Sequence, residues 1–208
     1  MTYPLLVVTA VAAEANAVRA GADPRHVVVE PVGVGPAAAA AGTARLLAAG
    51  RYRAVVSAGI AGGFPGRAPV GSTVLGTRSI AADLGAETPD GFLPVDDLGF
   101  GSSVVEADAA LVKALAAALP GAITGEVLTL STVTGTAATA ARLAERFPSA
   151  VAEAMEGYGV AVAAAGLPFV ELRTISNPIG PRDRTAWRLK EAFAALSTAS
   201  AALWTACG

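Results

Sequence analysis

Short β-branched apolar runs alternate with longer Ala-rich stretches along most of this chain. The apolar runs predict strands at residues 5–9, 27–32, 54–58, 74–81, 123–131 and 169–176. The Ala-rich stretches predict helices at 12–20, 36–49, 107–119 and 137–147, within 155–165, and at 185–207. Strands that alternate with helices indicate an α/β fold, in which a largely parallel sheet is covered on both faces.

Residues 83–103 interrupt this alternation. They are rich in Gly, Pro, Asp and Thr and predict one long loop, and long ordered loops in compact proteins usually have a function. Because no linker, charge run or internal repeat divides the chain, we expect residues 1–208 to form a single domain.

Composition then excludes several classes of protein. Charged residues make up 15% of the chain and the formal net charge is -2, without a basic stripe, so we expect no nucleic-acid partner. Gly, Pro, Arg or Thr breaks every apolar run, and the first residues lack a basic segment, so we expect neither a membrane span nor a signal peptide. One cysteine, Cys207, and one histidine, His26, cannot form a disulfide within the chain or a zinc cluster. We therefore expect a cytoplasmic protein without a metal or other cofactor.

Residues 33–38 (Gly-Val-Gly-Pro-Ala-Ala) match the G-x-G-x-x-A pattern of dinucleotide-binding proteins, between a predicted strand and a predicted helix. That pattern needs an acidic residue at the end of the next strand to hold the ribose, and residues 53–59 contain none. We therefore expect these glycines to allow close packing, or the close approach of a different ligand.

Three charged residues stand out because their surroundings are apolar. Glu14 follows the first predicted strand, Glu156 follows Met155, and Arg173 lies inside a strand that should be buried. A buried Arg needs charged partners. Each residue also has a structural interpretation, as a charge at a helix start, a solvated helix residue and a member of an internal salt bridge.

The expected position of a ligand follows from the sheet. In open α/β sheets, ligands bind beyond the carboxyl ends of the strands. This rule selects the segments 10–14, 33–36, 59–63, 131–135 and 176–183 as the rim of a pocket.

Several segments, taken together, resemble the nucleoside phosphorylase and nucleosidase superfamily. They are Thr-Ala-Val-Ala-Ala-Glu at 9–14, Gly-Val-Gly at 33–35, Ser-Ala-Gly-Ile-Ala-Gly-Gly at 57–63, Ala-Met-Glu-Gly at 154–157 and Arg-Thr-Ile-Ser-Asn at 173–177. Residues 176–184, with Trp187 and Leu189, are more similar to the futalosine hydrolases of menaquinone biosynthesis. The resemblance implies a nucleoside phosphorylase-like three-layer α/β/α fold with a mixed, largely parallel sheet, a small-molecule purine nucleoside as substrate, and a homo-oligomer, dimeric or larger.

The resemblance also implies roles for individual residues. As in methylthioadenosine nucleosidases, Glu14 would activate the attacking water, Glu156 would bind the ribose hydroxyls, Met155 would pack on the sugar and Arg173 would hold the water site. These roles suit the reaction, because cleavage of a glycosidic C–N bond builds positive charge on the sugar and needs a base for the water.

The purine would lie at the other end of the pocket. There the resemblance places the backbone of Val133 and Thr134 and the side chain of Asn177. The remaining expected substrate-binding residues are Ile60, Ala61, Gly62 and Ser176.

Asn177 departs from adenine-specific relatives, which carry Asp at this position. An amide can donate to O6 and accept from N7–H of a 6-oxopurine, so hypoxanthine is favoured over adenine. Asn177 before Pro178 is also typical of an Asx turn. The change removes the obvious acid for the leaving base; water or another group, Asp183 being one candidate, must replace it.

Other activities remain open on the sequence alone. Residues 9–14 carry an acid and no basic residue, which opposes a phosphate site and favours hydrolysis over phosphorolysis. The alternatives are a methylthioadenosine-type nucleosidase, a phosphorylase, and a nucleoside-binding module without catalysis. The benzoate-bearing arm of futalosine would be received by residues 83–103 or by Arg182 and Arg184, unless these form a solvated basic turn.

Overall fold

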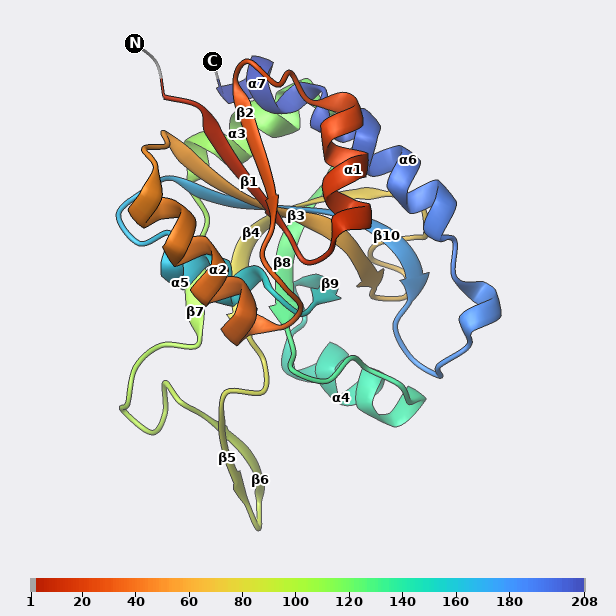
Figure 1. The fold of residues 1–208 in the computed structure, drawn as a ribbon. Helices are drawn as coiled ribbons and strands as arrows, with labels where there is room; N and C mark the ends of the chain where they lie inside the picture. Colours follow the sequence, from red (N-terminus) through yellow and green to blue (C-terminus); the bar gives the residue numbers. More distant parts are fainter. Residues whose placement is uncertain (1–2, 208) are drawn as a thin grey trace.

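The computed structural model describes residues 3–207, and the side chains of 206 and 207, including that of Cys207, lie outside the description. The chain forms a mixed α/β fold around an eight-stranded sheet (Figure 1). The strands of this sheet are β1 (Leu5–Thr9), β2 (Val27–Pro31), β3 (Ala54–Gly63), β4 (Thr73–Ala81), β7 (Val104–Glu106), β8 (Ile123–Thr129), β9 (Ala150–Ala154) and β10 (Phe169–Pro178). The helices are α1 (Ala12–Gly21), α2 (Pro36–Ala49), α3 (Ala109–Ala118), α4 (Ala137–Arg146), α5 (Gly157–Ala163), α6 (Leu189–Ser200) and α7 (Ala202–Cys207).

The sheet is largely parallel and closes on itself on one side. β1 pairs in parallel with β2 and β3, β3 with β10, and β8 with both β4 and β9. β10 and β4 are antiparallel, and the far end of β3 turns to pair antiparallel with β9 through Gly62 and Gly63. Gly63 has to be a glycine, because a Cβ atom there would lie 2.1 Å from the carbonyl oxygen of Ala68. This bend brings the ends of β3, β9 and β10 together.

Both faces of the sheet are buried under helices, as the continuous apolar runs predict. Leu5 and Val7 of β1 pack in the cluster that includes Val18 of α1 and Leu196 of α6. The alternate residues of β1 pack on the other face, under α2 and α5. Figure 1 shows these helix pairs on opposite sides of the sheet. Within residues 3–207, no helix is both long and apolar enough to cross a membrane.

The structure departs from the predicted elements in several places, some for local reasons and one because of pairing between distant strands. The strand predicted at 54–58 continues to Gly63, because its glycines lie in the sheet rather than ending it. Residues 150–154, which have a helix-like Ala-rich composition, form β9, because pairing with β8 and β3 buries all five residues and overrides propensity. Part of the loop predicted at 83–103 is a hairpin, β5 (Gly85–Thr88) and β6 (Gly91–Pro94), which Figure 1 shows projecting from the rest of the molecule.

The closing helix predicted at 185–207 is divided into three parts. A single 3₁₀ turn, η1 (Arg184–Ala186), comes first and is capped by the side chain of Asp183. Trp187 then adopts an extended backbone, which ends the turn before α6 begins at Leu189. The irregular segment between β10 and α6 therefore stays beside the carboxyl end of β10.

Candidate active site

A cavity of about 500 Å³ opens where the ends of β1, β3, β9 and β10 meet. All five segments selected by the strand-end rule contribute to its wall. The lining includes every predicted site residue except Arg173, namely Glu14, Ile60, Ala61, Gly62, Val133, Thr134, Met155, Glu156, Ser176 and Asn177. A second cavity of about 700 Å³ lies between α3, α6 and α7, and the described residues that line it are all neutral, so they offer no acid or base.

Glu14 projects from the first turn of α1 and is held by backbone N–H groups. Its Oε2 accepts hydrogen bonds from the amides of Ala10 (3.0 Å) and Val11 (3.2 Å), and its Oε1 accepts one from Ile60 (2.9 Å). The residue is 4% exposed. Burial raises the pKa of Glu14, and the nearby positive charge of Arg173 opposes this effect. A carboxylate that is fixed in place and has a raised pKa is suited to accept a proton.

Glu156 is the residue before α5 and is buried, not solvated. Its Oε1 accepts a hydrogen bond from the amide of Gly35 (3.2 Å), and its Oε2 lies 3.5 Å from Nη1 of Arg173. Gly35 has a φ of 87°, a conformation that favours glycine. The glycine pattern at 33–38 therefore allows close approach of the backbone to a carboxylate in the cavity wall.

Arg173 lies behind the cavity wall, with a 1% exposed side chain. Its Nε donates to Oε1 of Glu171 (2.8 Å) and its Nη2 donates to the hydroxyl of Ser57 (3.2 Å). Burial disfavours the charged guanidinium, but the charges of Glu171, Glu156 and Glu14 outweigh it and raise the pKa of Arg173. The structure thus brings the three predicted charged residues together. The positive charge of Arg173, behind the cavity wall, stabilises the carboxylates of Glu14 and Glu156.

Asn177 and Thr134 line the cavity away from Glu14. Asn177 accepts a hydrogen bond at Oδ1 from the Ser176 hydroxyl (2.8 Å) and donates from Nδ2 to the carbonyl of Pro178 (3.0 Å). The amide of Ile179 donates to Gly63, so the Asx turn considered for Asn177 does not form. One N–H of the Asn177 amide therefore has no partner among the described residues and is available to a ligand.

Glu153 was not predicted and belongs to the same wall. It is 4% exposed, and its Oε1 accepts a hydrogen bond from the amide of Thr134 (2.7 Å). Its Oε2 accepts one from the Thr134 hydroxyl. Glu14 and Glu156 were selected because they are acidic residues in apolar surroundings, and Glu153 fits the same pattern. It was not selected because residues 150–154 were not recognised as a buried strand.

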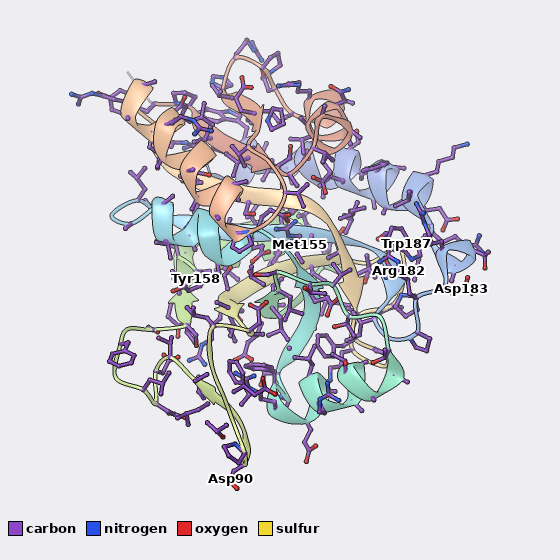
Figure 2. The ribbon with its side chains drawn as sticks, turned by 60° about the horizontal axis from the view of Figure 1, so that its bottom comes forward. Asp90, Met155, Tyr158, Arg182, Asp183 and Trp187 are labelled. Carbon is purple, nitrogen blue, oxygen red and sulfur yellow. The ribbon has the colours of Figure 1, made fainter. Side chains whose placement is uncertain are left out.

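The outer part of the cavity is formed by the segment after β10. Figure 2 shows Arg182 and Trp187 on this side, and the Arg182 guanidinium carbon lies 5.4 Å from the centre of the Trp187 ring. Asp183 also lines the cavity, but its carboxylate accepts two hydrogen bonds from Thr185, which lower its pKa. Asp183 is therefore a poor proton donor. Residues 83–103 do not contribute to the described wall, and Figure 2 shows Asp90 far from it.

Known proteins match this chain over most of its length. The family model described as the phosphorylase superfamily matches residues 10–207. The futalosine hydrolase of Streptomyces coelicolor is 56% identical, over 94% of this chain and 92% of that protein. The futalosine hydrolase of Acidothermus cellulolyticus is 46% identical, over 96% and 92%.

Solved structures match the fold. A methylthioadenosine/S-adenosylhomocysteine nucleosidase from Colwellia psychrerythraea, in complex with adenine, has a TM-score of 0.85 at 22% identity, covering 99% of this chain and 96% of that one. The native futalosine hydrolase of Helicobacter pylori has a TM-score of 0.81 at 16% identity, covering 99% and 97%. The matches to sequence and fold agree, and the chain belongs to the phosphorylase superfamily, within it to the futalosine hydrolases.

Proposed function

We propose that this protein hydrolyses the N-glycosidic bond of futalosine, releasing hypoxanthine and dehypoxanthine futalosine in menaquinone biosynthesis. The observation that carries the mechanism is that Glu14 and Glu156 open onto one cavity while Arg173 supports both from behind it. Two carboxylates around one sugar satisfy the two needs of the reaction, a base for water and a negative charge near the developing oxocarbenium ion.

Each acid has a separate role in this proposal. Glu14, with its raised pKa, takes the proton of the attacking water. Glu156 binds the ribose hydroxyls and opposes the positive charge of the sugar, while Met155 packs against the ring. Arg173 is a positioning residue, because its side chain contacts Glu156 and Glu171 rather than the cavity.

Asn177 favours a 6-oxopurine. The free N–H of its amide suits the O6 of hypoxanthine, whereas the 6-amino group of adenine would bring two N–H groups together. Arg182 and Trp187, at the outer part of the cavity, supply a cation and an aromatic face for the carboxylated aromatic arm of futalosine.

Hydrolysis is favoured over phosphorolysis by the charges around the cavity. Glu14 and Glu156 line it, and the nearest guanidinium to these two acids, that of Arg173, is already engaged by carboxylates. A phosphate dianion beside Glu14 and Glu156 would meet their negative charge, and among the described residues no free cation lies at that end of the cavity, since Arg182 belongs to the outer part.

The test is incubation of the purified protein with futalosine, its 6-amino analogue, inosine and methylthioadenosine, with and without phosphate. We expect free hypoxanthine from futalosine at a rate that phosphate does not change. Release of base that requires phosphate would establish a phosphorylase, and a preference for methylthioadenosine would establish the alternative nucleosidase.

We also propose that the protein is a cytoplasmic homo-oligomer. Phe100 is 83% exposed, and Phe92 and Leu84 are exposed in the same projecting segment, so a second copy of the chain would find apolar side chains to cover there. Sedimentation velocity tests this, and a monomer at micromolar concentration would refute it.

A further inference from the structure

The proposed hydrolysis lacks a proton for the leaving purine. The electron pair of the broken C–N bond moves to the base, which leaves readily only if a ring nitrogen gains a proton. The Asn177 amide is not an acid at neutral pH, and Asp183 is held as a carboxylate by Thr185. The proton must therefore come from water or from another group at this end of the cavity.

Glu153 is the remaining carboxyl group in the cavity wall at this end. In the sheet it pairs with Gly62, and a Cβ atom built at Gly62 would lie 3.5 Å from Cγ of Glu153 and 3.6 Å from Nδ2 of Asn177. Glu153 and Asn177 thus flank the same glycine. An acid at position 153 lies at the part of the cavity where Asn177 would contact a purine.

The surroundings of Glu153 favour its neutral form. β3 presents Gly62, β8 presents Leu128 and the loop after β8 presents Thr134, and none of these is ionisable. Arg67, the cation beside β9, donates instead to the carbonyls of Phe147 and Ala150. Burial raises the pKa of Glu153, against the opposing effect of the hydrogen bonds from Thr134.

Within the described part of the chain, the other ionisable groups of the cavity do not contact the Glu153 carboxyl group. Glu14, Glu156, Arg182 and Asp183 line the same cavity, and none of them forms a hydrogen bond or ion pair with Glu153 among the residues described. A buried carboxyl without a cationic partner holds its proton more strongly than an exposed one.

The protonation state of Glu153 also sets the direction of the Thr134 hydroxyl. When Glu153 is ionised, the hydroxyl donates to Oε2. When Glu153 is protonated, Oε2–H donates to the hydroxyl oxygen, and the Thr134 hydrogen is free to turn toward a ligand in the cavity. Thr134 is the only described partner of both Glu153 oxygens, so these two states differ in one hydrogen bond.

We propose, on the basis of the function proposed above, that Glu153 supplies the proton for the leaving purine and that the Thr134 hydroxyl transfers it. As the C–N bond breaks, a purine ring nitrogen takes the hydroxyl proton of Thr134, and Thr134 takes the proton of Glu153. Glu153 is left as a carboxylate and Glu14 holds the proton released by the attacking water. Exchange of both acids with solvent restores the starting state, so the net reaction is the hydrolysis alone.

The test compares two leaving groups in the full-length protein. Futalosine needs a proton on its base, whereas the nitrophenolate of p-nitrophenyl β-D-ribofuranoside leaves without one. We expect Glu153→Gln and Thr134→Val to lower kcat on futalosine by about 100-fold, with KM little changed, and to leave the p-nitrophenyl rate near that of the wild type. Thr134→Ser, which keeps the hydroxyl, should retain most of the activity on futalosine.

The pH profile of kcat on futalosine tests the role of Glu153 without the second substrate. Because the acid must be protonated, kcat of the wild type should fall as pH rises through the raised pKa of Glu153, and Glu153→Gln should lack this alkaline limb. An unchanged limb, full activity of Thr134→Val, or equal losses on both substrates would overturn the proposal. Glu14→Gln should lower both rates, so a failure of the proposed hydrolysis is distinguished from a failure of this inference.

Discussion

Gly59 decides where the Glu14 carboxylate can lie, and Gly59→Ala is therefore a sharp test of the site. A Cβ atom at position 59 would lie 2.5 Å from Oε1 of Glu14 and 2.8 Å from Nη1 of Arg173. Non-bonded atoms of this kind need about 3.5 Å, so the carboxylate has to move by about 1 Å. This movement also weakens its hydrogen bond from the Ile60 amide.

The expected effect of Gly59→Ala on catalysis is large. A misplacement of about 1 Å at a reacting group costs about 100-fold in rate. That loss corresponds to about 2.7 kcal/mol of activation free energy. The free energy of unfolding should fall by about 1–3 kcal/mol, because the added methyl group overpacks a buried site.

The assay is kcat/KM for futalosine, with thermal unfolding measured in parallel. Gly50→Ala is the matched control, because the three atoms nearest to its Cβ all belong to the ring end of Tyr52, the closest at 2.8 Å, and Gly50 lies at the other end of α2 from Gly35. We expect the control to keep wild-type kcat/KM. A folded Gly59→Ala protein with full activity would refute the assignment of Glu14, and equal losses in both variants would show that the effect is not local.

Three further outcomes follow from the same contacts. Glu156→Gln keeps an acceptor for the Gly35 amide but removes the negative charge, so kcat should fall by about 100-fold or more in steady-state kinetics while the fold is retained. Since Glu14 must be ionised to accept a proton, kcat/KM should fall as pH decreases through its raised pKa, and the midpoint of that acidic limb should lie above the ordinary value of 4.5. Gly157→Ala places a Cβ atom 2.1 Å from Oε2 of Glu171, which breaks the buried pair with Arg173 and should cost about 3–5 kcal/mol in denaturant unfolding.

Much of the fold follows from patterns that depend on local sequence. Pro36 and Gly50 mark the ends of α2 at the predicted residues, because one residue fits the first turn and the other stops the helix. β9 was not predictable in the same way. Its Ala-Val-Ala-Glu-Ala sequence has no local preference for a strand, and only pairing with β8 and β3, distant in the chain, makes it one.

Some features of the site were likewise predictable from local sequence, whereas others depend on contacts between residues far apart in the chain. The strand-end rule selected five of the segments that line the cavity, because it depends only on chain direction in the sheet, but it missed residues 153–156, since β9 was not predicted. The contact between Gly35 and Glu156 joins residues 121 positions apart, and no local pattern contains it. Glu153 illustrates the limit most clearly, since its role depends on being opposite Gly62 and beneath Thr134, both of which are tertiary facts.

The location of Arg173 behind the cavity wall, rather than in it, has a consequence for inhibitor chemistry. A sugar mimic whose ring carries a protonated amine would lie beside the carboxylates of Glu14 and Glu156. The guanidinium of Arg173 is behind the cavity wall and would not contact this amine. Anionic groups such as phosphonates or sulfonates at the same position would be repelled by these carboxylates, which would lower the binding affinity. Compounds built for this enzyme should therefore carry positive charge at the ring and reserve any acidic group for the distal arm, beside Arg182.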